Sequence, residues 1–224
     1  MVYANTNPDV GIVEGTSCFV VPRDTPGFKI ETVNEKMERR YIINGEVLFD
    51  NCRLPEDHLL IRDDAYLKIR TYSVAGNTAE AAQALGVAQG AFDKTVLYVQ
   101  EHFQGGRRII QHQVIAARLA NMATRLEAAR AFLYYTGRAI DAGASDAGKL
   151  LHMLKIHCVE SAFEVCKDAV EIHGGSGVMT ELGIEKHFRD ATIALHTDGT
   201  TDIHRFRIVN AMFPDTVGAY AGPL

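Results

Sequence analysis

The chain lacks the features that mark several common classes of protein. No apolar run in its 224 residues approaches the roughly 20 residues that a membrane-spanning helix needs. The N-terminal residues have neither the basic start nor the apolar core of a secretory signal peptide. The net charge of -5 leaves no basic stripe for phosphate contacts. We therefore expect no membrane association and no nucleic-acid partner.

Cysteine is also sparse, and its spacing predicts neither a disulfide framework nor a zinc site. The four cysteines contain no CxxC pair; they are Cys18, Cys52, Cys158 and Cys166. This usage is typical of a reduced, cytoplasmic protein in which cysteines serve as small core residues.

Proline is missing from residues 73–211, and the apolar residues there recur at helical spacing. We predict helices over residues 77–100, 111–141, 145–172, 183–194 and 200–212. The second helix carries an apolar stripe made of Ile115, Leu119, Met122, Leu126, Ala129, Leu133, Thr136 and Ile140. Long helices with short links predict an up-and-down helical bundle.

Residues 1–60 contain turn signals and β-formers instead. We predict strands over residues 17–21 and 28–31, and a hairpin of residues 41–43 and 46–49 around a tight turn at Asn44-Gly45. The fold class is then α+β: a partial antiparallel β-domain over residues 1–60, followed by the bundle over residues 61–224. A sheet of so few strands buries little surface. We therefore expect either that another chain completes the sheet or that this chain is part of a longer protein.

Two polar segments are candidates for chemistry. The glycines of residues 171–177 either end a helix and form a turn, or bring backbone N–H groups close to a phosphate. Residues 198–205 begin the last helix. Asp198 and Thr200 are either helix N-capping residues, or this segment supplies a carboxylate base or binds an anion at the helix N-terminus.

A third interpretation of residues 196–205 is a metal site made of His196, Asp198, Asp202 and His204. The spacing of these residues matches no familiar zinc or non-haem iron pattern. We therefore expect no metal.

The order and spacing of several segments resemble the acyl-CoA dehydrogenase family. A-L-G-V-A-Q at residues 84–89 resembles the family's A-x-G-x-A-Q, and D-G-T-T-D-I-H-R at residues 198–205 resembles its E-G-T-S-x-I-Q-R. Further matches lie at residues 15–28, 47–55, 105–113, 171–177 and 185–190. The resemblance implies an FAD-dependent enzyme that oxidises an acyl-CoA thioester to the enoyl-CoA. A carboxylate removes the proton next to the thioester carbonyl, and a hydride passes to flavin N5.

By this resemblance the base falls on Asp198, where glutamate is usual. The carboxylate is one methylene shorter, so Asp198 is either a base aimed at a different carbon or a weak one. Some ring-acyl-CoA members of the family use aspartate here, which favours an alicyclic or unsaturated acyl-CoA as substrate. The base position of branched-chain members falls on Gly76, which cannot serve.

The resemblance also implies ligand contacts, with FAD bound partly by a neighbouring subunit. The implied FAD-binding residues are His102, Gln113, Glu171, Gly174, Gly175, Thr200 and Asp202, and the implied substrate-binding residues are Asn77, Gly199 and Arg205. Three of them depart from the family: His102 and Asn77 replace arginines, and Glu171 replaces a glutamine. An acid beside a pyrophosphate is unfavourable unless it turns away or is protonated.

The family's N-terminal helical domain and the start of its β-domain have no counterpart in this sequence. We therefore expect a fragment or one subunit of a split enzyme, with little activity alone. The alternative is a non-catalytic assembly module of a heteromeric dehydrogenase. The resemblance further implies a homo- or hetero-oligomer, a tetramer in the family, formed through the bundle, and an electron-transfer flavoprotein or similar acceptor.

Overall fold

The computed structural model describes residues 1–214, except for the side chains of residues 70–73. Its contacts define two compact units, which divide between residues 73 and 74. The two predicted domains, residues 1–60 and 61–224, stay a prediction. The last residues of the second domain lie outside the described part of the chain. The fold class is α+β, as predicted.

The first unit contains a small antiparallel sheet of order β1-β2-β5. Its strands are β1 (Val2–Asn5), β2 (Thr16–Phe19) and β5 (Leu59–Ile61). A short 3-10 turn (Pro8–Val10) and α1 (Gly11–Gly15) join β1 to β2, and a 3-10 turn (Glu56–His58) precedes β5. A Cβ on Gly15 would lie 2.1 Å from the Asn7 carbonyl oxygen, so this tight connection requires glycine.

A second ribbon of two strands, β3 (Phe28–Val33) and β4 (Gly45–Phe49), corrects the predicted hairpin. Residues 41–43 form no strand, and β4 pairs with β3 instead. The Phe28 and Phe49 rings lie 5.2 Å apart, and Ile30 faces Val47 across the ribbon. Local alternation identified β4 correctly, but cross-strand packing of these apolar side chains decides its partner.

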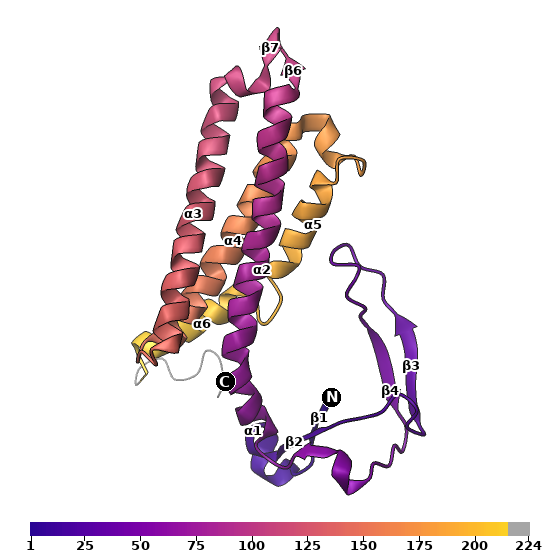
Figure 1. Ribbon diagram of the computed structural model, residues 1–224. Coiled ribbons are helices and arrows are strands. Elements are labelled where there is room, and N and C mark those ends of the chain that lie inside the picture. The colour runs from indigo at the N-terminus through magenta and orange to yellow at the C-terminus, as the bar shows by residue number, and fades with distance from the viewer. Residues whose placement is uncertain (215–224) are drawn as a thin grey trace. The chain divides into compact units, whose positions relative to one another are not determined.

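The second unit is a helical bundle (Figure 1). Its helices are α2 (Ala65–Glu101), which begins in the first unit, α3 (Gln113–Asp141), α4 (Ala147–His173), α5 (Ile184–Ala194) and α6 (Thr201–Met212). A hairpin of β6 (Phe103–Gln104) and β7 (Arg107–Arg108) and a 3-10 turn (Ile109–Gln111) link α2 to α3, and a 3-10 turn (Gly174–Val178) follows α4. The predicted helices are thus confirmed, except that the first begins earlier than expected.

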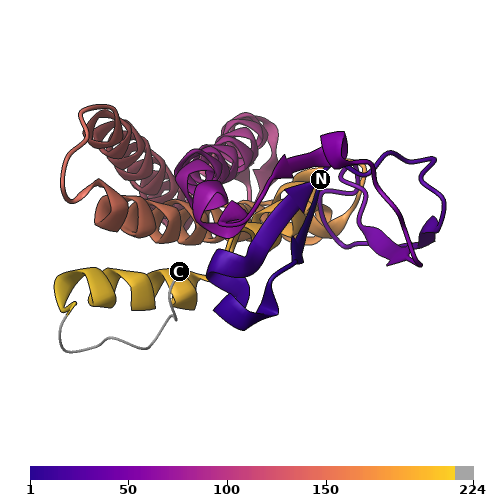
Figure 2. The same cartoon turned by 90° about the horizontal axis from the view of Figure 1, so that it is seen from below.

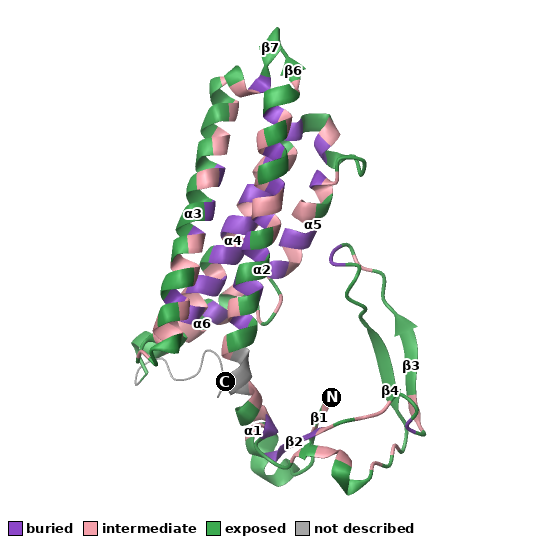
Figure 3. Cartoon of the chain, viewed as in Figure 1, coloured by how far each residue is buried: buried purple, intermediate pink, exposed green. Residues whose placement is uncertain are grey.

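Helix α4 is the central element of the bundle. It packs against α3, α5 and α6, and Figure 2 shows α6 lengthwise while α2 and α3 are seen nearly end-on. Buried residues follow the inner faces of the helices, whereas β3 and β4 are exposed (Figure 3).

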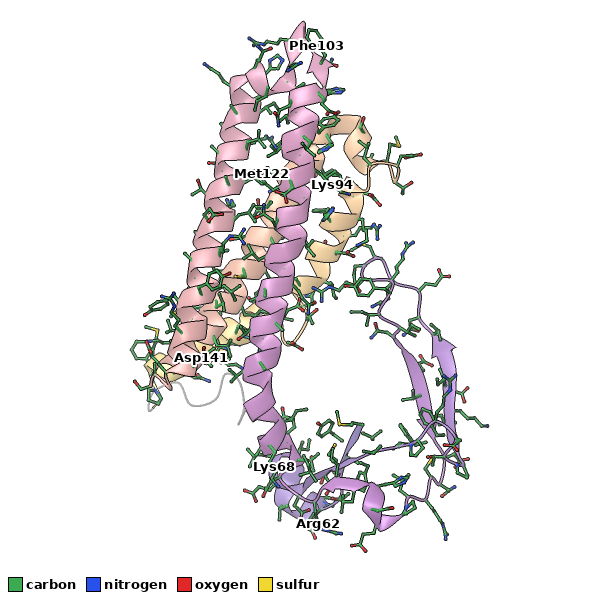
Figure 4. The ribbon with its side chains drawn as sticks, viewed as in Figure 1. Arg62, Lys68, Lys94, Phe103, Met122 and Asp141 are labelled. Atoms are coloured by element: carbon green, nitrogen blue, oxygen red, sulfur yellow. The ribbon has the colours of Figure 1, made fainter. Side chains whose placement is uncertain are left out.

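The apolar stripe predicted for the second helix is part of this core. Met122, Leu126, Ala129 and Thr136 are buried along α3, and Figure 4 labels Met122 on the inner side of that helix. On α2 the buried apolar residues are mostly alanines, which let this helix approach its neighbours closely.

In the part of the chain that the structure describes, no helix has the length and apolar character needed to cross a membrane. All four cysteines are free thiols.

Candidate functional site

The residues singled out from the sequence gather in two separate regions of the bundle, one near the β6–β7 hairpin and one at the loop between α5 and α6 (Figure 1). One group lies where α4 ends at His173, below the β6–β7 hairpin. The other lies on the loop from α5 to α6, which carries Asp198. Lys155, about a third of the way along α4, and Gly174, just past its C-terminal end, are about 28 Å apart along the helix, at a rise of about 1.5 Å per residue.

At the His173 end, three flat side chains border a cavity of about 570 Å³. The Tyr98 ring stacks on His173 with centroids 4.0 Å apart and on His102 with centroids 4.7 Å apart. His173 is buried, and its Nδ1 donates to the Ala169 carbonyl oxygen over 2.7 Å. Burial lowers the pKa of His173, so this ring is neutral near pH 7.

Two glycines complete the wall of this cavity. Gly174 has φ +57°, a conformation that ends α4 and that L-residues rarely adopt. A Cβ on Gly174 or Gly175 would meet nothing within 4 Å, so the backbone here is open to a ligand. Stacked rings beside open backbone suit a planar heterocycle joined to a phosphate.

The structure brings His102, Gly174 and Gly175 together in this cavity, but not the other two residues expected near them. Gln113 is the first residue of α3 and is exposed, although its neighbours His112 and Val114 line the cavity. Glu171 is also outside the lining, and its carboxylate lies 4.0 Å from the guanidinium of Arg118.

In the other region, Asp198 is exposed on the α5–α6 loop with φ +54°. Its carboxylate lies close to Gly76 on α2. A Cβ built on Gly76 would be 3.5 Å from Asp198 Oδ2. Gly76 and Asp198 are the two positions at which the family resemblance puts a base. Although far apart in the sequence, they are neighbours in the fold, and the missing side chain at Gly76 leaves space beside the carboxylate.

Two fully buried side chains hold the backbone of this loop. His204 on α6 places its Nε2 atom 3.2 Å from the Asp198 carbonyl oxygen. Lys155 on α4 donates from Nζ to the carbonyl oxygens of Gly199 at 2.9 Å and Ala194 at 3.0 Å. Both side chains have an exposed fraction of 0%.

Burial also sets the protonation of this cluster. It lowers the pKa of Lys155, a shift that the carboxylates of Glu80, Asp198 and Glu160 oppose. It lowers the pKa of His204 to about 4 and that of His152, whose Nδ1 lies 3.0 Å from His204 Nδ1, to about 4.

Lys155 and His152 were not identified from the sequence. Lys155 stands four residues after Leu151 and three before Cys158, so it lies on the apolar stripe of its own helix. A lysine at such a position was the available signal, because lysine is almost never fully buried without partners.

The remaining predicted residues lie around this loop. Thr200 caps α6 by accepting from the Ile203 N–H at 3.4 Å. Arg205 binds Asp202 at 2.9 Å and also contacts Glu160.

Asn77 follows Gly76 on α2 and is buried, with an exposed fraction of 3%. Among the described residues, no three His, Cys, Asp or Glu side chains converge in a way that would hold a metal ion.

Residues 76–213 match the profile of the acyl-CoA dehydrogenase C-terminal domain. The chain is 36% identical over 206 residues to acryloyl-CoA reductase (NADH) of Anaerotignum propionicum, covering 92% of this chain and 52% of that protein. It is 37% identical over 204 residues to the mitochondrial short/branched chain specific acyl-CoA dehydrogenase of Rattus norvegicus, covering 91% of this chain and 47% of that protein.

A solved structure described as PigA with FAD and proline has a similar fold. It superimposes with a TM-score of 0.86 at 27% identity, covering 94% of this chain and 55% of that one. The chain belongs to the acyl-CoA dehydrogenase family. It spans about half the length of the curated relatives that it matches.

Proposed function

We propose that this chain provides the base-bearing part of an FAD-dependent acyl-CoA dehydrogenase. The observation that carries the proposal is the approach of Asp198 to Gly76. The two base positions of the family lie side by side, one holds a carboxylate and the other leaves room for a substrate. Asp198 removes the proton next to the thioester carbonyl, and FAD, when bound, accepts the hydride.

The cavity at the His173 end fits the nucleotide part of FAD. Tyr98, His102 and His173 offer flat faces, and Gly174 and Gly175 offer backbone that no neighbouring atom closes off. Gln113, at the first turn of α3, would contact FAD from the rim. Glu171 points its charge at Arg118 and is not part of the lining, which removes the electrostatic objection to a diphosphate there.

Gly199, Thr200, Asp202 and Arg205 follow the proposed base along the loop and the first turns of α6. Thr200 and Asp202 would contact the cofactor, and Gly199 and Arg205 the acyl-CoA. The N-terminus of α6 favours a negatively charged group at this point. Asn77, buried beside Gly76, would contact the substrate from α2.

The distance between the cavity and Asp198 favours an oligomer. Lys155, which binds the Asp198 loop, and Gly174 in the cavity wall are about 28 Å apart along α4, so the FAD held in the cavity of one copy would serve the base of another. We propose a homo- or hetero-oligomer formed through the bundle, with a tetramer as the expected form, in the cytoplasm. An electron-transfer flavoprotein or a similar protein would reoxidise the FAD.

The substrate class follows from the shorter base. We propose an alicyclic or unsaturated acyl-CoA, because aspartate reaches less far than glutamate and Gly76 leaves additional room for the acyl group. The name of the Anaerotignum relative refers to an unsaturated acyl-CoA.

A non-catalytic assembly module is the second candidate. The observation that favours it is the ribbon of β3 and β4, whose apolar side chains, including Ile30, Val47 and Phe49, are exposed in the described structure and would suit a partner chain.

Replacement of Asp198 by asparagine separates the two candidates. In the assembled holoenzyme, Asp198→Asn should lower acyl-CoA turnover by about 10²- to 10⁴-fold while the visible flavin spectrum is retained. Glu181→Gln, which changes an exposed carboxylate before α5, is the matched control. Unchanged turnover in Asp198→Asn would reject Asp198 as the base and leave the assembly role.

A further inference from the structure

The loop that carries Asp198 has a backbone conformation that needs support from its surroundings. Asp198 has φ +54° and Gly199 has φ +101°. Glycine adopts a positive φ freely, but a residue with a side chain does so much less often, and the angle at Asp198 persists where neighbouring structure holds it. The Asp198 side chain is exposed, so packing of that side chain cannot supply the support.

The support comes from two donors that reach this loop from different helices. His204 binds the carbonyl oxygen of Asp198, and Lys155 binds that of Gly199. The carbonyl groups of Asp198 and Gly199 are thus both bound by side chains with no exposed surface. Lys155 also binds the last turn of α5 at Ala194, which anchors both ends of the loop to α4.

The protons of this cluster follow from its acceptors. A carbonyl oxygen can only accept, so His204 Nε2 must carry a hydrogen. In the neutral ring, His204 Nδ1 then lacks one and accepts from His152 Nδ1–H at 3.0 Å. His152 therefore fixes the tautomer of His204, much as an outer residue fixes a catalytic imidazole.

The charge of Lys155 adds an electrostatic link. Asp198 and Lys155 attract each other, as do Lys155 and Glu80. The ammonium group lies beneath the loop, bound to backbone, so its charge acts on the Asp198 carboxylate while leaving that carboxylate open to a substrate.

We propose that His204 and Lys155 are positioning residues for Asp198, which hold the two carbonyl groups at residues 198 and 199 and so aim the carboxylate at the substrate, with His152 setting the tautomer of His204. This rests on the proposed role of Asp198 as the base. Neither residue touches the substrate in this scheme; each acts through the loop backbone.

The first experiment needs no substitution. Long-range proton–nitrogen spectra of the histidine rings at pH 7 should show His204 as the Nε2–H tautomer and His152 as the Nδ1–H tautomer. Any other pair of tautomers overturns the proposal. Because this spectrum is recorded on the unaltered protein, the test survives even if a variant does not fold.

The second experiment measures amide hydrogen exchange of Thr201, whose N–H binds the Leu195 carbonyl across the loop at 3.3 Å. His204→Leu leaves one carbonyl without its side-chain donor and Lys155→Met leaves two, so each variant should speed this exchange on the order of tenfold or more. His204→Gln keeps an N–H donor and should restore most of the protection. His196→Leu and Lys149→Met are controls on the same loop and the same helix, and should match the wild type. Unchanged exchange in both His204→Leu and Lys155→Met would reject the proposal.

The third experiment uses the assembled holoenzyme. A displacement of the base of about 1 Å costs on the order of 10²-fold in rate, so His204→Leu should lower kcat by about that factor with KM little changed, and His204→Gln should recover it. Equal kcat in His204→Leu and wild type contradicts the positioning role. If Asp198→Asn leaves turnover unchanged, the proposed function fails, while the tautomers and exchange rates still decide whether the loop is held as described.

Discussion

The buried histidine pair predicts how the stability of the bundle responds to acid. His152 and His204 have pKa values lowered from 6.5 to about 4, mainly by burial. Below pH 6.5 the unfolded chain binds protons that the folded chain does not. The stability contributed by the neutral pair is therefore complete above pH 6.5 and is lost as the pH falls from 6.5 towards 4.

The size of the effect follows from these two values. At pH 5 an unfolded histidine with a pKa of 6.5 is almost fully protonated, and the folded one is almost neutral. The difference lowers the free energy of unfolding by about 2 kcal/mol for His204, which is fully buried. His152 is partly exposed and contributes less. Such a loss is a substantial part, roughly an eighth to two fifths, of the about 5–15 kcal/mol that typically stabilises a domain.

The assay is urea denaturation at pH 7.5 and pH 5.0 on the wild type and on His204→Gln. The variant should lose about 2 kcal/mol less than the wild type between these two pH values, because glutamine binds no proton. His196→Gln removes an exposed histidine from the neighbouring loop and should behave as the wild type. If wild type and His204→Gln lose the same stability, His204 is not held neutral in the folded chain and the reasoning is wrong.

Three further outcomes can be measured on the same protein. Gly177→Ala should lower the melting temperature by several degrees, because the new Cβ would lie 2.4 Å from the Val170 carbonyl oxygen, whereas Gly137→Ala on α3 meets nothing within 4 Å and should raise it slightly. Cys158 and Cys166, whose pKa values burial raises to about 12, should resist a thiol reagent until urea unfolds the chain; modification at the rate of an unfolded control would contradict this. Gly199→Ala should speed loop exchange as His204→Leu does, since a Cβ there lies 3.3 Å from His204 Nε2; wild-type exchange would refute that.

The helices were readable from the sequence because their limits are set locally. Gly174, whose φ of +57° favours glycine, ends α4 one residue after the predicted stop, and Thr200 caps α6 as its type suggests. The ribbon of β3 and β4 was not readable in this way. Period-two alternation predicts a strand but not the strand with which it pairs. The Phe28–Phe49 contact that selects this pairing joins distant parts of the sequence.

The candidate site was predictable only in part, for a related reason. Asp198 and the two glycines at 174 and 175 follow from motifs, because each motif is a short stretch of chain. The approach of Asp198 to Gly76 and the hydrogen bond from Lys155 to Gly199 depend on how whole helices pack. Periodicity predicts which face of a helix is buried, but not which buried atom meets which.

The ribbon of β3 and β4 has a consequence for handling the protein. Among the described residues it is a sheet of two strands, so no third strand pairs with either edge. Its side chains are almost all exposed, including Ile30, Val33, Val47, Leu48 and Phe49. Open backbone edges with apolar side chains are templates for pairing with another chain. The ribbon will therefore promote strand-to-strand self-association when the chain is concentrated in the absence of a partner that covers it. Val47→Lys should suppress this self-association.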